Sequence, residues 1–205
     1  RGRFWLHRQM REKERDMELI LASGSPRRRE LLSLTGLPYV VDAPEVDESC
    51  ALPPEEAVQE ISRRKGLAGA AAHPGCVVLS ADTLVAVDGK ALGKPHSEEE
   101  AFQMLSLLSG RWHQVYTGVC AVDAQGMVHQ RVVGTQVHFC PMTEEEIRRY
   151  IATGEPMDKA GAYAVQGIAG LWIDKLEGSY SNVIGLPMHT VRELLDECGL
   201  HCWRA

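Results

Sequence analysis

The stretch CVVLSADT, residues 76–83, is the part of the sequence that says most about the fold. Residues 76–81 are a short apolar run, typical of a central strand covered on both faces, and Asp82 and Thr83 follow it directly. Functional groups in parallel α/β sheets gather at the carboxyl ends of central strands. Asp82 is therefore a candidate to hold a divalent cation or to accept a proton from water. Taken alone, an aspartate in this place could equally be an ordinary turn residue.

Strand-like and helix-like patterns alternate on both sides of this run, which predicts an α/β fold. Serine, threonine or proline residues open the expected helices, and glycines end several of them. Further strands are expected at 19–22, 39–41, 85–92 (a hairpin), 115–122, 128–139, 162–165 and 171–176. Helices are expected at 25–34, 53–73, 97–108, 143–154 and 187–197.

The composition limits the classes of function. With 205 residues, of which 44% are hydrophobic and 24% charged, the chain resembles one globular domain. It contains no run of eighteen apolar residues, so no membrane span is expected. A formal net charge of −6 argues against nucleic acid as a partner, because the chain would repel a phosphate backbone. The six cysteines include no C-x-x-C pair, which favours a reducing, cytoplasmic compartment.

Residues 1–16 differ from the rest of the chain in charge and pattern. They carry six basic and three acidic side chains and precede the first strand pattern. Such a segment could bind a membrane surface, but chain termini are often dispensable, so we expect a disordered or added extension that activity does not need. The sequence therefore predicts an extension at 1–16 and one domain at 17–205.

The junction between the first strand and the first helix reads Ser23-Gly24-Ser25-Pro26-Arg27-Arg28-Arg29. A glycine, a capping serine and a proline at the first helical position present free backbone N–H groups beside several guanidinium groups, and this combination suits phosphate binding. The alternative is a normal capped helix with a solvated basic first turn. Positive charge there opposes the helix dipole, which favours an anion as its partner.

Other polar side chains lie where they could join such a site. Asp47 and Glu48 follow the second expected strand, and two carboxylates beside an arginine cluster suit metal-assisted chemistry on a phosphate. Lys94 and Lys159 fall in expected loops, and Lys65 on an expected helix. Each lysine alone is more typical of a solvated surface.

Five motifs, taken together in their order and spacing, resemble the Maf family of nucleoside triphosphate pyrophosphatases. They read LILASGSPRRRELL (19–32), LSADT (79–83), LGKP (92–95), GEPMDKAGAYAVQG (154–167) and GSYSNVIGLP (178–187). The resemblance extends from Leu19 to the last expected helix. It implies a mixed central sheet flanked by helices, with two lobes around a cleft, related to the inosine triphosphate pyrophosphatases.

The resemblance also implies an activity and roles for residues. Family members cleave a nucleoside triphosphate between its α and β phosphates, use a divalent cation (Mg²⁺ or Mn²⁺), and are often homodimers. By position, Asp82 matches the proton acceptor. The substrate-binding positions are Ser23, Arg27, Arg28, Lys65, Thr83, Lys94, Lys159 and Gln166, and the metal positions are Asp82 and Glu48. Gly66, where many relatives have alanine, is a departure expected to affect only local helix stability.

Within the family, the stretch 154–167 is similar to the subgroup that acts on dTTP and UTP. The neutral amide of Gln166 can answer the acceptor–donor–acceptor edge of uracil or thymine with both its N–H₂ and its C=O. Relatives that act on 7-methyl-GTP have an acidic residue near this position. Two alternatives stay open: a pyrophosphatase for 7-methyl-GTP or another modified purine, and a nucleotide-binding regulator of cell division.

Overall fold

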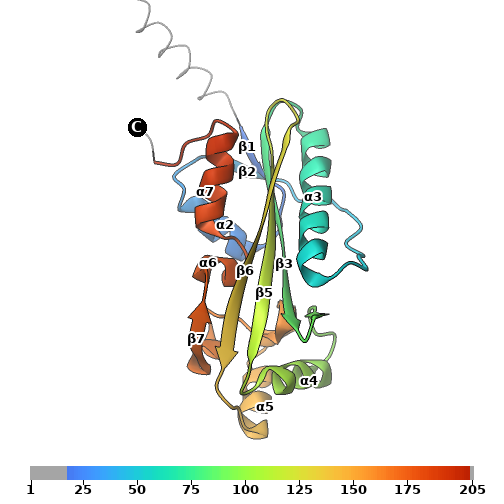
Figure 1. Cartoon of the computed structure of the whole chain (residues 1–205), viewed down its shortest axis with the longest axis vertical. Helices are drawn as coiled ribbons and strands as arrows, with labels where there is room; N and C mark the ends of the chain where they lie inside the picture. Colours follow the sequence, from blue (N-terminus) through green and yellow to red (C-terminus); the bar gives the residue numbers. More distant parts are fainter. Residues whose placement is uncertain (1–17, 204–205) are drawn as a thin grey trace, which may run out of the picture.

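The computed structural model describes residues 18–203 as strands and helices around one mixed sheet (Figure 1). The predicted extension at 1–16 lies outside the described residues. The strands are β1 (Leu19–Leu21), β2 (Tyr39–Val41), β3 (Val77–Val87), β4 (Lys90–Leu92), β5 (Trp112–Val122), β6 (Val128–Phe139) and β7 (Ile173–Glu177). The α-helices are α2 (Pro26–Ser33), α3 (Pro54–Ala72), α4 (Glu98–Leu108), α5 (Glu144–Ala152), α6 (Tyr180–Ile184) and α7 (Met188–Glu197). Short 3₁₀ helices are η1 (Glu155–Asp158), η2 (Ala160–Ala162) and η3 (Ile168–Leu171).

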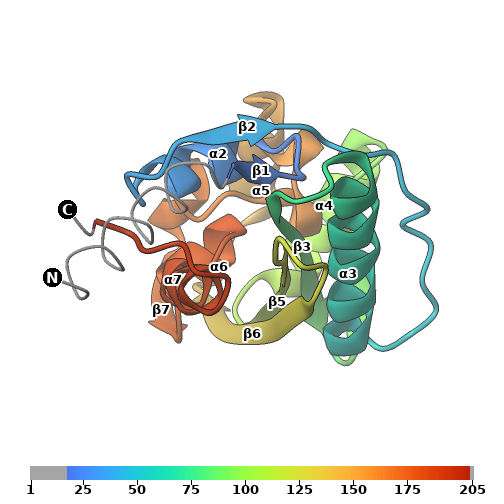
Figure 2. The same cartoon turned by 90° about the horizontal axis from the view of Figure 1, so that it is seen from above.

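The sheet has the order β2-β1-β3-β5-β6-β7, with β4 paired to β3 beside the main path. β1 pairs in parallel with β2 and β3, whereas all the other pairs are antiparallel. Seen from above, α3 lies on one side of β3 and β5, and α6 and α7 lie on the other (Figure 2). The mixed α/β sheet flanked by helices confirms the predicted fold class. None of the helices within residues 18–203 is long and apolar enough to cross a membrane.

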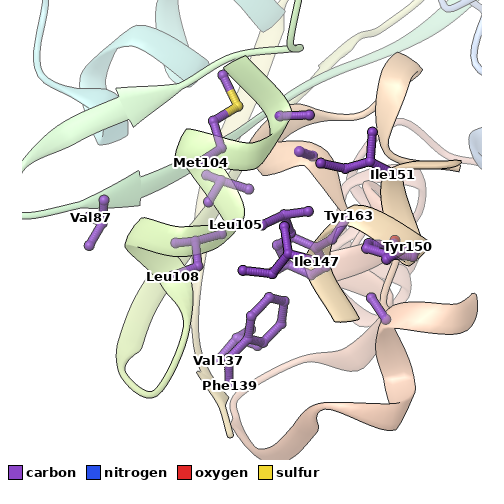
Figure 3. Close-up of a cluster of buried hydrophobic side chains, with 14 of the residues drawn as sticks. Val87, Met104, Leu105, Leu108, Val137, Phe139, Ile147, Tyr150, Ile151 and Tyr163 are labelled. Carbon is purple, nitrogen blue, oxygen red and sulfur yellow. The ribbon is translucent and has the colours of Figure 1, made fainter. Parts of the chain in front are cut away.

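Within residues 18–203, the long strands β3 and β5 contribute to three hydrophobic clusters, of which the two largest form the cores of two lobes. The first cluster includes Val77, Leu79 and Ala81 and packs against side chains of α2 and α7. The second includes Val85 and Val87 and packs against α4 and α5, as Figure 3 shows. Between the clusters, β3 carries the polar pair Asp82 and Thr83. The predicted two-lobed arrangement is therefore present, and the polar segment of β3 lies between the lobes.

Helix α3 packs closely on the sheet at Gly66. A Cβ on Gly66 would lie 2.8 Å from Cys120 Sγ and 3.0 Å from Ser80 Oγ, so the glycine is needed for close contact. The expectation that this departure concerns only helix stability was incomplete, because Cys120 occupies the space that an alanine methyl would fill. Close packing at this point brings the preceding residue, Lys65, within reach of Asp82 on β3.

The structure corrects two expectations about the strands. The strand predicted to end before Asp82 continues to Val87, because it is continuous with the first strand of the expected hairpin. The strand expected at 162–165 is wrong: Gly161 (φ 68°) and Ala162 (φ 61°) adopt left-handed backbone angles, which a strand excludes. The expected strand at 171–176 is present as β7, and helix α6 was not predicted. The capping serine and threonine residues Ser25, Ser97 and Thr143 are in place.

Candidate active site

The candidate site opens where one edge of β3 has no strand partner. β1 pairs with β3 only as far as Leu79, and β4 pairs with it only from Val85 onwards. Among the described residues, positions 80–84 are therefore unpaired on that edge, although β5 continues along the other edge. Successive side chains of a strand point to opposite faces, so Asp82 shares the α3 face with Ser80 while Thr83 points to the other face. The interrupted edge makes both side chains accessible from one cavity.

Asp82 pairs with a lysine that also contacts a second carboxylate. Lys65 Nζ lies 2.8 Å from Asp82 Oδ1 and 3.0 Å from Glu48 Oε1. Asp82 is 8% exposed, and this burial raises the pKa of its carboxyl against the opposing effect of Lys65. The structure therefore brings Asp82, Glu48 and Lys65 together, and Lys65 on α3 balances the negative charge of the buried Asp82 carboxylate.

Arg28 connects the start of α2 to β3 and α6. The side chain of Ser25 caps α2 and accepts the Arg28 N–H at 3.5 Å. The guanidinium donates to Ser23 Oγ (3.2 Å), Thr83 Oγ1 (3.1 Å) and Gly185 O (2.8 Å). These partners are all neutral, so the positive charge of Arg28 is not balanced by a directly bonded carboxylate. Burial also lowers the pKa of this guanidinium, and a bound anion would offset that cost.

A cavity of about 770 Å³ extends from this cluster across the gap between the lobes. This volume lies within the range of ligand pockets. All ten residues that the resemblance assigned to the site line it: Ser23, Arg27, Arg28, Glu48, Lys65, Asp82, Thr83, Lys94, Lys159 and Gln166. Asp47 and Arg29, which the sequence pattern also suggested, do not line it: Asp47 Oδ1 accepts the Ser49 N–H, and Arg29 donates to Gly24 O. Five cationic side chains thus line one cavity of a chain whose net charge is −6, which favours an anionic ligand held locally.

The far side of the cavity is built from loops. Lys159 Nζ donates to Glu155 O (2.9 Å) and to Asp158 Oδ1 (2.7 Å), and the latter bond lowers the pKa of Asp158. Lys94 lies in the loop after β4, which contacts the Lys159 loop because Gly161 N donates to Gly93 O at 3.0 Å. Gln166 is exposed and faces the same cavity.

Sequence reasoning missed several residues of the cavity wall. Tyr163, Val183 and Gly185 also line it, as do His96 and Glu100 at the start of α4. Tyr163 and Gly185 belong to motifs that carried the resemblance, so the motifs were the signal that could have revealed them. His96 and Glu100 occupy a helix cap, in which Glu100 Oε2 accepts the His96 N–H, and a cap has no functional signature.

The residues present fit a divalent cation bound together with a phosphate ligand. Within residues 18–203, no group of three or more histidine, cysteine, aspartate or glutamate side chains could by itself hold a metal ion. Mg²⁺, however, is usually held by one or two carboxylates together with phosphate oxygens and water. Asp82 and Glu48 meet at one ammonium group, so the site can supply two carboxylates to one cation.

The fold and the cavity define a class: an α/β protein whose mixed sheet presents a buried carboxylate and a cluster of cations to a phosphorylated ligand. The profile of the Maf-like protein family matches residues 18–198, and the chain belongs to that family. A dTTP/UTP pyrophosphatase of Symbiobacterium thermophilum is 50% identical, over 89% of this chain and 94% of the relative. A dTTP/UTP pyrophosphatase of Moorella thermoacetica is 47% identical, over 91% and 97%.

A solved structure of a HAM1 protein from Coxiella burnetii is similar at 14% identity with a TM-score of 0.49, over 88% of this chain and 99% of that chain. Similarity at this level adds nothing to the family assignment, which rests on the profile match and on the sequence relatives.

Proposed function

We propose that this protein hydrolyses dTTP and UTP to the nucleoside monophosphate and pyrophosphate. The observation that carries the proposal is the position of Asp82: a buried carboxylate, compensated by Lys65, at an open strand edge in a cavity with four further cations. Relatives that are 50% and 47% identical over most of their length are named dTTP/UTP pyrophosphatases, which supports the same substrates here.

In the proposed reaction, a water molecule attacks the α-phosphorus, the bond from that phosphorus to the oxygen bridging to the β-phosphate breaks, and pyrophosphate leaves. Asp82 accepts the proton of the attacking water. Lys65 orients the Asp82 carboxylate through its 2.8 Å contact. Arg27, Arg28 and Lys94 neutralise charge on the phosphates, which is greatest on the leaving pyrophosphate. Asp82 and Glu48 would hold Mg²⁺ or Mn²⁺, whose charge polarises the bound phosphates.

The loops at the far side of the cavity are proposed to recognise the base. Gln166 can pair its amide with the imide edge of uracil or thymine. Lys159 is held near the same loop by two hydrogen bonds and extends the cationic lining toward the substrate. The proposal includes a cytoplasmic location, because all six cysteines are free thiols, as is typical of a reducing compartment. A homodimeric state stays a prediction.

A panel of nucleoside triphosphates with detection of pyrophosphate and monophosphate tests this function. With Mg²⁺ present, we expect many turnovers per chain on UTP and dTTP, with one pyrophosphate released for each monophosphate. A higher kcat/KM on 7-methyl-GTP than on UTP would show that 7-methyl-GTP, and not UTP, is the preferred substrate. Binding of nucleotide without turnover would instead identify a regulator. The Asp82→Asn protein, purified in parallel, controls for a contaminating pyrophosphatase.

A further inference from the structure

The segment from residue 159 to residue 168 carries Lys159 and Gln166 but belongs to no strand. It consists of 3₁₀ turns and irregular backbone, with left-handed angles at Gly161 and Ala162. Such a segment lacks the ladder of hydrogen bonds that fixes Asp82 in β3. Its position must therefore depend on specific contacts with side chains outside it.

One carboxylate contacts this segment directly at one point and through a tyrosine hydroxyl at another. Glu155 Oε2 accepts the hydroxyl hydrogen of Tyr150 at 2.5 Å, and both carboxylate oxygens lie 3.1 Å from Ile168 N, which donates to them. The same Tyr150 hydroxyl accepts the Ala164 N–H at 3.3 Å. The pair formed by Glu155 and Tyr150 therefore holds the backbone at 164 and at 168, on both sides of Gln166.

This carboxylate also packs against the backbone beside Gln166. A Cβ on Gly167 would lie 2.1 Å from Glu155 Oε1, so the carboxylate rests directly against the glycine backbone next to Gln166. The backbone oxygen of Glu155 accepts Lys159 Nζ at 2.9 Å. Glu155 thus contacts both ends of the segment, at Lys159 and at Ile168, although it is not among the residues that line the cavity.

Tyr150 gives this arrangement a rigid base. Its ring is 2% exposed, lies in the hydrophobic cluster of the α4–α5 lobe (Figure 3), and contacts the ring of Trp172 at a centroid distance of 5.8 Å. Burial, together with the neighbouring carboxylate of Glu155, raises the pKa of the Tyr150 hydroxyl, so it remains a donor at neutral pH. The position of the loop is in this way tied to a packed core.

We propose that Glu155 is a positioning residue for base selection: it holds Gln166 and Lys159 at the positions in the cavity wall that pyrimidine recognition requires. This inference rests on the proposed function of the site. It assigns to Glu155 an effect on substrate choice and on KM. Proton transfer takes place at Asp82, on the other side of the cavity, and does not depend on Glu155.

The principal test replaces Glu155 by glutamine, which keeps the shape but offers only one acceptor oxygen. The amide then directs an N–H₂ donor toward either the Tyr150 hydroxyl or the Ile168 N–H. We expect kcat/KM for UTP to fall ~10- to 100-fold, because a misplacement of about 1 Å can cost on the order of 10²-fold. Most of the fall should be in KM, since contacts to the base are equal in the ground and transition states. The UTP-to-GTP ratio of kcat/KM should fall with it.

Two further variants separate positioning from general stability. Tyr150→Phe keeps the buried ring and removes only the hydroxyl, so it should lower the UTP-to-GTP ratio in the same direction even if Glu155→Gln folds poorly. In a Gln166→Ala background, Glu155→Gln should lower the ratio no further, because its effect passes through Gln166. The matched control is Glu146→Gln. The Glu146 carboxylate caps α5, the helix that carries Tyr150, and contacts Thr143 and Trp172. It should leave the ratio unchanged.

The possible outcomes distinguish this inference from the proposed function. A wild-type protein that does not hydrolyse UTP or dTTP would overturn the proposed function itself. With wild-type activity established, an unchanged UTP-to-GTP ratio in both Glu155→Gln and Tyr150→Phe would overturn the positioning role. Independent, additive effects of Glu155→Gln and Gln166→Ala on the ratio would overturn it as well, as would an unchanged ratio in Gln166→Ala alone.

Discussion

The two sides of the cavity are built in different ways. The sheet side consists of Ser23, Arg28, Lys65, Asp82 and Thr83, which lie on or next to β1, β3, α2 and α3 and bond to one another or to the backbone. The loop side consists of Lys94, Lys159 and Gln166, which lie in loops and turns outside the strands and the helices. Asp82 is 8% exposed, whereas Gln166 and Lys94 are exposed.

This difference indicates a division of labour. Groups that act on a transition state need fixed positions, and a strand anchored in a hydrophobic cluster on either side of Asp82 and Thr83 supplies them. Groups that select among bases can lie on loops, whose sequence changes without disturbing the core. We therefore expect substitutions on the sheet side to abolish turnover, and substitutions on the loop side to change which nucleotide is used.

The largest effect is expected for Asp82→Asn, on the sheet side. The amide has the same shape but can neither accept the proton of water nor balance the charge of a cation, so kcat should fall at least ~10²-fold. The fold should persist, because burial disfavours the charge that the substitution removes. The measurement is pyrophosphate release together with a thermal unfolding curve.

Asp88→Asn is the matched control for that experiment. Asp88 lies between β3 and β4, is exposed, and pairs with Arg111 at 2.6 Å outside the cavity. It should keep wild-type kcat. Near-normal turnover in a folded Asp82→Asn protein would remove Asp82 from the mechanism and, with it, the contrast between the two sides.

A somewhat smaller effect is expected for Arg27→Ala. Arg27 lines the cavity beside Arg28, and within residues 18–203 it has no hydrogen-bond or ion-pair partner, so its guanidinium is available to a phosphate. A charge-assisted hydrogen bond contributes roughly 1.5–3 kcal/mol, which corresponds to a ~10- to 100-fold loss of kcat/KM. Arg29, on the same helical turn, is exposed and donates to Gly24 O, so Arg29→Ala is the control. Equal kinetics for both variants would contradict a phosphate cradle at the start of α2.

How much the sequence revealed also differs between the two sides. The apolar run before Asp82 and the capped, arginine-rich start of α2 indicated the sheet side by pattern alone, because regular elements leave periodic signals. Two points were misjudged from the pattern. Lys65 had the pattern of a solvated lysine but pairs with Asp82, and the strand continues past Asp82, so that the site arises from an interruption in its partner strands. Pairing between distant strands has no local signature, so this feature could not be read from residues 76–83.

The loop side was identified from the resemblance and not from the pattern. Residues 162–165 alternate in a way that suggests a strand, yet Ala162 is left-handed and the segment is held by Glu155 and Tyr150. These contacts join residues whose spacing matches no element, so periodicity says nothing about them. Residues that determine specificity through such contacts can be found by comparing motifs or from a structure.

Gln166→Glu tests the loop side directly. The carboxylate loses the N–H₂ donor and faces the carbonyl acceptors of uracil, but it can accept from the N1–H and N2–H₂ groups of guanine. The ratio of kcat/KM for UTP and dTTP to that for GTP and 7-methyl-GTP should therefore fall, and kcat should change less than in Asp82→Asn. Gln125→Glu, at an exposed turn between β5 and β6, controls for the added charge. An unchanged ratio would show that Gln166 does not read the base.

The smallest effect concerns His113, which contacts Tyr163 next to the loop side, and the dependence of the free energy of unfolding on pH. His113 is fully buried, its Nε2 lies 2.7 Å from the hydroxyl of Tyr163, and its Nδ1 has no hydrogen-bond partner among the described residues. Burial lowers the pKa of His113 to about 4, whereas an unfolded histidine titrates near 6.5. Below pH 6.5 the unfolded chain therefore binds a proton that the folded chain does not, and stability is lost as the pH falls toward 4.

Between pH 7.5 and 5.5 this loss amounts to about 1 kcal/mol of the free energy of unfolding. His113→Gln removes the titrating group, so the free energy of unfolding should fall less between these two pH values than in the wild type, as measured by urea denaturation. His189→Gln, at an exposed histidine of α7, should keep the wild-type difference. Because Tyr163 lines the cavity and Asp82 does not contact His113, any loss of activity in His113→Gln should be in KM. An equal pH dependence in wild type and His113→Gln would show that this buried pair does not link the loop side to acid stability.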